Sequence, residues 1–183
     1  AHPGDSASRA IHLKSGTVIE GRALDVTRDA VVVEFAGVHG SRGTLKRGDV
    51  LPSDFFDLLL ENLDPKTADD WLGLAKEAAA LGLHTDRMWS LQNAARLDEK
   101  RAPDIQKDID ACRNACSDLR LSVAQGFLDA GELERARKFL KEVMNEYRGC
   151  IAVEKAKALA KTIDENLENE REKASKILDE RRR

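Results

Sequence analysis

Three cysteines are the residues of this chain best suited to bind a metal ion or to form a covalent link. Cys112 and Cys116 lie four positions apart, so in a helix their thiols share one face, and Cys150 follows later. A structural zinc site needs four such ligands, and only His84 is a further candidate nearby. We expect no metal site. Buried thiols are the preferred interpretation, and a disulfide between Cys150 and one of the pair is the alternative.

Basic side chains in the first quarter of the chain form a second candidate site. They are Arg22, Arg28, Arg42, Lys46 and Arg47. Guanidinium and ammonium groups gathered in this way bind the phosphates of nucleic acids. The segment from Arg9 to Val50 has seven basic and five acidic residues, so its positive excess is small. Nucleic-acid binding is therefore an alternative function for this segment and not the preferred one.

No sequence motif of an established enzyme class is present. The chain has no glycine-rich phosphate loop, nucleophile elbow, HExxH motif or paired CxxC motifs. The loop "GVHGSRG" carries His39 and Arg42, and the segment "ADDW" carries Asp69 and Asp70. A hairpin connection accounts for the first, and helix N-terminal acids that complement the helix dipole account for the second. We predict no catalytic residues and no cofactor, with an enzyme of unknown class as a remaining alternative.

The composition is that of a globular, largely helical protein. Of the 183 residues, 42% are hydrophobic, 34% are charged and 4% are aromatic, and the net charge is -3. This charge provides no overall field that attracts nucleic acid or an anionic membrane. No apolar run reaches the roughly 18 to 20 residues of a membrane-spanning helix. Residues 1–8 are small and polar and are expected to be flexible.

The positioning elements begin with a strand-rich segment over residues 9–52. The stretch "AIHLKSGTVIEGRALDVTRDAVVVEF" is rich in β-branched residues, and "KSG" and "TRD" mark hairpin turns. Four or five short strands in so few residues predict a small, strongly bent β-barrel. Gly21, in the middle of a strand pattern, is the expected bend.

"LKSGTVIEGRALDV", the valine-rich strand and the closing "LKRGDV" resemble the Sm-like and SH3-like small barrels. The resemblance implies the barrel fold. In the Sm family an Asp, an Asn and an Arg-Gly pair build an RNA pocket. Here Ala30 stands where the Asn would fall, and Arg47 and Gly48 correspond to the closing pair. RNA binding is accordingly the alternative function that this resemblance suggests.

Helical periodicity replaces the strand pattern over residues 53–149. Ser53 is the expected cap of the first helix, and Thr67 with Asp70 predicts a capping box for the second. Gly82 is expected to end that second helix, and a further helix follows after a short turn. Pro103 opens a long helix that Gly131 ends, and the next helix packs back along it.

The two helical hairpins resemble tetratricopeptide repeats, in which small and large residues alternate at fixed offsets. In "SVAQGFLDAGELERARKFLKEVM", Ala124, Gly131 and Ala136 separate Phe127, Leu133 and Leu140. Small residues at these positions let two helices cross closely. The resemblance implies an assembly or peptide-binding surface, since two repeats leave faces for another element or a partner to cover. A self-contained helical bundle is the alternative.

Residues 150–183 predict one long amphipathic helix without glycine or proline. Its apolar residues step by three and four, as in a heptad seam that Glu170 interrupts. The residues expected to contact another helix are Ile163, Leu167, Ala174 and Ile177. A solvated single helix is the alternative.

These features together predict an α+β chain that is mostly α, with a small barrel, tetratricopeptide-like hairpins and a long C-terminal helix. The arrangement resembles exported bacterial proteins of planctomycete type with degenerate helical repeats. That resemblance, together with the start at Ala1, implies a periplasmic, cell-surface or secreted protein whose signal has been removed, with the cytoplasm as alternative. We expect a non-enzymatic scaffold that mediates protein-protein interaction, including homo-oligomer formation by self-assembly into a ring or filament.

Overall fold

The computed structural model describes residues 8–37 and 40–182. Within the last helix, it does not describe the side chains of residues 170, 174 and 178–182. The residues divide into two compact units, one up to Ile109 and one from Asp110 onward. The elements in chain order are β1 (Arg9–His12), β2 (Val18–Val26), β3 (Ala30–Phe35), β4 (Arg42–Lys46), α1 (Pro52–Leu63), α2 (Ala68–Ala80), α3 (His84–Leu97), α4 (Ala102–Asp129), α5 (Leu133–Glu146) and α6 (Ala152–Arg182). The expected flexible N-terminus, apart from Ser8, lies outside the described residues.

The four strands form one antiparallel sheet in the order β1-β2-β3-β4. A single bridge joins Leu13, after β1, to Val50, after β4. A register shift between Ala23 and Asp25 places a bulge in β2, which bends that strand. Because β1 and β4 do not pair with each other, the sheet is open, and the predicted barrel is not confirmed.

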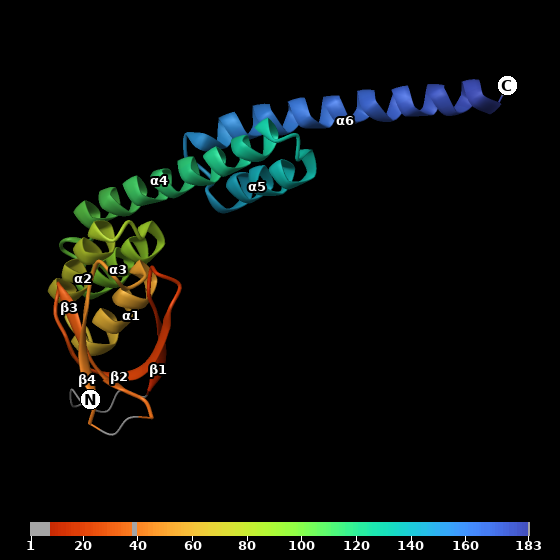
Figure 1. The fold of residues 1–183 in the computed structure, drawn as a ribbon. Helices are drawn as coiled ribbons and strands as arrows, with labels where there is room; N and C mark the ends of the chain where they lie inside the picture. The colour runs from red at the N-terminus through yellow and green to blue at the C-terminus, as the bar shows by residue number, and fades with distance from the viewer. Residues whose placement is uncertain (1–7, 38–39, 183) are drawn as a thin grey trace. The chain divides into compact units, whose positions relative to one another are not determined.

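Helix α1 covers the inner face of this sheet (Figure 1). Its buried residues Phe55, Phe56, Leu58 and Leu59 share one core with Val31 and Val33 of β3 and with residues of the neighbouring strands and α2. An antiparallel sheet with one apolar face needs such a cover, since each face that is buried must exclude water. The predicted division after residue 52 therefore falls inside a continuous core.

The start of α1 differs from the sequence expectation. Leu51, with extended backbone, precedes the helix, and Pro52 occupies its first position. Proline suits this position because its fixed φ is helical and its missing N–H would have no partner within the helix. Ser53 lies within the first turn and does not cap it, so the prediction of a serine cap was wrong.

Gly21 lies where β2 and β3 approach each other closely. A Cβ atom added at this glycine would lie 2.5 Å from Cγ1 of Val33 and 2.6 Å from the carbonyl oxygen of Glu34. Gly43 has a similar role on β4, because an added Cβ would lie 2.6 Å from the ring of Phe35. These two glycines allow the strands to carry large side chains directly beside them.

Helices α2 and α3 form a hairpin in the first unit. Thr67 accepts a hydrogen bond from the backbone N–H of Asp70, whose carboxylate accepts one from the backbone of Thr67, so the predicted capping box is confirmed. Gly82 ends α2 with a φ of 75°, a left-handed conformation that favours glycine. The rings of Trp71 and Trp89 meet edge to face, with 4.8 Å between their centroids.

The second unit is built on a hairpin of α4 and α5. The small residues Ala124 and Ala136 are fully buried in one core with Leu140 and Val143, so the small residues of the alternating pattern face the interior, while the close crossing of the two helices stays a prediction. The rings of Phe127 and Phe139 stack with 5.4 Å between centroids. Arg120 joins the two helices through a 3.0 Å ion pair with Glu142.

Helix α6 packs along α5, and those of its described side chains that lie in the shared core belong to its first half. Ala152, Ala156 and Ile163 are buried in the core of the second unit, and Leu167 is partly buried against it. Beyond Leu167, α6 continues past the end of α5 (Figure 1). The chain is therefore an α+β protein that is mostly helical, as predicted, while the tetratricopeptide likeness stays a prediction.

We expect Gly21→Ala to destabilise the first unit. The new methyl group has no room between Val33 and the backbone of β3, so the strands must shift, which costs about 1–3 kcal/mol. Chemical denaturation followed by circular dichroism measures the free energy of unfolding. Gly48→Ala is the control, because nothing lies within 4 Å of its added Cβ. Equal stabilities of the two variants would contradict the close approach at Gly21.

Candidate interaction surfaces

The sequence-predicted cationic residues of the sheet are paired with acidic side chains. Arg22 and Glu34 are direct neighbours across β2 and β3, and Arg42 is the neighbour of Glu34 across β3 and β4. The guanidinium of Arg22 lies 2.9 Å from the Glu34 carboxylate, and that of Arg42 lies 3.9 Å from it. One carboxylate therefore offsets the charge of two of the predicted cations.

Glu77 of α2 has the same role for two further cations. Arg28 and Arg47 each lie 3.0 Å from its carboxylate, and Arg47 also donates to the backbone carbonyl of Arg28. Arg47 lies over the ring of Phe55, 5.6 Å from its centroid, which adds a cation–π contact. Since Glu77 comes from a helix distant in sequence, strand-based reasoning did not find it.

Lys46 is the remaining member of the predicted cationic site. It is exposed on β4, and its ammonium group has no ion-pair partner among the described residues. The structure therefore groups four of the five predicted cations in two pairs, one around Glu34 and one around Glu77. Lys46, and in part Arg42, can still form an ion pair with another molecule.

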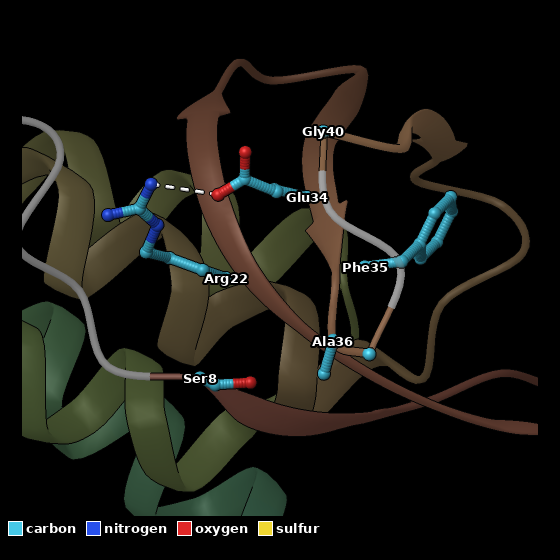
Figure 2. A pocket seen from close by; sticks show the side chains of 7 residues that line it. Ser8, Arg22, Glu34, Phe35, Ala36 and Gly40 are labelled. Atoms are coloured by element: carbon cyan, nitrogen blue, oxygen red, sulfur yellow. Dashed lines mark hydrogen bonds and ion pairs between the residues drawn. The ribbon is translucent and has the colours of Figure 1, made fainter.

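A cavity of about 350 Å³ lies beside the Arg22–Glu34 pair (Figure 2). It is lined by Ser8, Arg22, Glu34, Phe35, Ala36, Gly37 and Gly40. Figure 2 shows the ion pair on one side of this cavity and the Phe35 ring on the other. Its two charged lining groups pair with each other, so the described lining gives the cavity a polar side at this ion pair and an aromatic side at Phe35.

The other residues considered for chemistry are scattered. His39 lies outside the described residues. Asp69 pairs with Arg101 at 2.8 Å, Asp70 caps α2, and His84 is the first residue of α3. All three cysteines are buried, as the preferred interpretation of their pattern expected. Among the described residues, no group of three or more His, Cys, Asp or Glu side chains is placed to hold a metal ion.

An interaction that the sequence analysis missed joins the first strand to α1. The carboxylate of Asp54 accepts a hydrogen bond from the backbone N–H of His12 at 2.7 Å and lies 2.8 Å from Nδ1 of the same residue. Partial burial raises the pKa of Asp54, but the hydrogen bonds with His12 outweigh it, so the pKa lies below its usual value. An acid in the first turn of the helix after the strands was the available signal.

The predicted contact residues of α6 differ in their surroundings. Ile163 is 1% exposed and Leu167 is half-buried, both against the core of the second unit. Ile177 lies on the same heptad seam and is 52% exposed. Ala174 lies within the helix, but its side chain is outside the described residues. An ion pair of 2.9 Å between Arg137 and Asp164 accompanies the buried part of the seam.

Comparison with protein-family models, with characterised proteins and with solved structures found no match. In the part of the chain that the structure describes, no helix combines the length and the apolar character needed to cross a membrane.

We expect the stability of the protein to depend on pH through Asp54. Its carboxyl pKa is lower in the folded state than the ordinary value of 3.8, so its stabilising contribution is present above that value. It is lost as the pH falls through the folded-state pKa. Asp54→Asn keeps an oxygen that accepts from His12 but lacks the charge, so the stability gap between variant and wild type should shrink in acid.

Denaturant titrations at pH 7 and near pH 3 measure this gap. Asp118→Asn is the control, because that residue is exposed on α4. A gap for Asp54→Asn that stays constant across this range would contradict the assignment.

We expect the paired acids to mask the cationic residues from nucleic acid. Glu34→Gln combined with Glu77→Gln should strengthen binding of a 20-nucleotide single strand about tenfold at low salt, since four guanidinium groups lose their carboxylates. Fluorescence anisotropy at several salt concentrations measures the affinity. Asp25→Asn with Asp29→Asn changes the net charge equally in the same region. Equal gains for both double variants would show that pairing is not what masks the site.

Proposed function

We propose that this chain is a non-enzymatic scaffold protein that binds other protein chains, and copies of itself in particular, through the distal half of helix α6. The observation that carries this proposal is a heptad seam that is buried at one end and exposed at the other. Ile163 and Leu167 use the seam within the second unit, and Ile177 continues it where α5 no longer covers it.

The exposed part of the seam is long enough to contact another helix. From residue 168 to 182 the helix extends by roughly 20 Å beyond Leu167. An isolated helix gains little from an exposed isoleucine, whereas burial of that side chain against a partner contributes about 1.5–3 kcal/mol. A partner helix is therefore the occupant that this seam favours.

The exposed seam of α6 is better suited to contact a different surface of a second copy than to contact the same seam of that copy. In a parallel pair of α6 helices, the two copies of Glu170 would share one core layer, and two carboxylates there repel each other. Helix α4 offers a different apolar surface, since Leu119 and Val123 lie four apart and are 59% and 38% exposed. Contacts between two unlike surfaces build closed rings or open filaments.

Nucleic-acid binding by the sheet is not the preferred function. The pairing of Arg22, Arg28, Arg42 and Arg47 with acids favours protein binding over nucleic-acid binding for the sheet. Export from the cytoplasm stays a prediction that rests on a sequence resemblance, as do the small-barrel and tetratricopeptide likenesses.

We expect self-association to depend on Ile177. Static light scattering across a concentration series should give the wild type a mass that is a multiple of 20.3 kDa, or one that grows with concentration. Ile177→Asp places a charge in the proposed contact and should return the mass to that of a monomer. Ser175→Asp adds the same charge at an exposed neighbour outside the seam and should retain the wild-type mass.

A wild-type mass near 20.3 kDa at every concentration would exclude self-assembly and leave a different protein as the partner. Association that Ile177→Asp and Ser175→Asp weaken equally would contradict the role of the seam.

A further inference from the structure

The outer edge of strand β4 has backbone groups that point away from the sheet. Hydrogen bonds from Phe35 N–H to the Ser41 carbonyl and from Arg47 N–H to the Asp29 carbonyl fix the alternation of the β3–β4 ladder. In an antiparallel pair, every second residue directs its N–H and C=O toward the partner strand and the others direct them outward. The outward residues of β4 are therefore Arg42, Thr44 and Lys46, of which Lys46 already accepts a hydrogen bond from the Asp49 N–H at its carbonyl, at 2.9 Å.

The opposite edge of the sheet is closed. His12 is an outward residue of β1, and its carbonyl accepts a hydrogen bond from the Leu51 N–H at 2.8 Å, while its N–H donates to Asp54. Lys14 N–H donates to the Asp49 carbonyl just beyond the strand. An exposed strand edge is a template for pairing with another chain, and natural sheets usually block it. Here β1 is largely blocked, whereas Thr44 has no backbone partner on its outer side among the described residues.

The side chains along the β4 edge carry positive charge. Arg42, Thr44 and Lys46 are all exposed and share one face of the strand. The Arg42 side chain is 64% exposed, and its only ion-pair contact among the described residues is the 3.9 Å approach to Glu34, which has a closer partner in Arg22. Lys46 likewise has a side chain that is open to a new anion.

We propose that the β4 edge binds an extended acidic segment of another protein, which adds to the sheet as a fifth strand. The outward N–H and C=O of Thr44 would pair with the backbone of the added strand. In antiparallel pairing, acidic side chains four residues apart in the segment lie directly opposite Arg42 and Lys46. The edge would therefore select extended peptides in which two acidic residues are separated by three other residues.

A second copy of β4 fits this edge poorly. A symmetric antiparallel pair centred on Thr44 would set Arg42 of one chain opposite Lys46 of the other, and like charges directly opposite each other are destabilising. Nucleic acid fits poorly as well, because it offers no row of amides for the outward backbone groups. This inference does not depend on helix α6 or on the function proposed for it.

The test uses the full chain and a synthetic peptide, acetyl-Ser-Glu-Val-Thr-Val-Glu-Ser-amide. Nuclear magnetic resonance titration should move the backbone amide signals of Arg42, Thr44 and Lys46, and those of α6 should stay unchanged. The same peptide with Lys in place of both Glu residues should bind at least tenfold more weakly. So should a peptide N-methylated at its central Thr, which lacks the N–H for the Thr44 carbonyl.

Two variants of the protein test the edge itself. Thr44→Pro removes the outward N–H without removing a bond to β3, and it should weaken peptide binding at least tenfold. Thr44→Ala keeps that N–H and should bind like the wild type. If Thr44→Pro does not fold, the N-methylated peptide on the wild-type chain tests the same hydrogen-bonded pairing.

Equal binding of the acidic and basic peptides, or of the methylated and unmethylated ones, would overturn the proposal. A single-stranded oligonucleotide that competes with the peptide for the same amide signals would also overturn it. So would a mass of Thr44→Pro, measured by light scattering without peptide, that is lower than the mass of the wild type, because this result would identify a second copy as the occupant.

Discussion

Burial of the phenyl groups of α1 against the sheet is the interaction on which the first unit depends. Four short strands that form an open sheet cannot exclude water from an apolar face by themselves. Phe55 and Phe56 fill that face, and Arg47 lies over the Phe55 ring at its border. The same docking brings Asp54 to the edge of β1, where it closes the backbone of His12. Covering the core and blocking one edge are therefore two consequences of one helix position.

This position makes the two edges of the sheet unequal. One edge has its backbone groups bonded to the start of α1, and the other presents Thr44 between two cations. The cations that pair with Glu34 and Glu77 have a carboxylate beside them, so they contribute little to an outward field. The cations that remain open at the surface are Lys46 and, in part, Arg42.

The second unit depends on small residues in the same way that the first depends on large ones. Ala124 of α4 and Ala136 of α5 are fully buried in the core that also buries Leu140 and Val143 beside α6. Beyond Leu167, which is partly buried against this core, the described side chains of α6 are exposed. Ile177, on the part of α6 beyond that core, is exposed and would lose contact with water only against a partner, which is the basis of the proposed scaffold role.

Local signals in the sequence determined the elements of this protein. The capping box of Thr67 and Asp70, the glycine at 82 and the alternation of small and large residues near Ala124 act over a few residues, so their outcome does not require knowledge of distant contacts. The tertiary structure alone decided how the charges are used. Glu77 meets Arg28 and Arg47, and Asp54 meets His12, across separations that no local pattern encodes. It likewise decided that the sheet stays open at β4, because strand closure depends on how α1 and the chain beyond β4 pack, and not on the propensity of any strand.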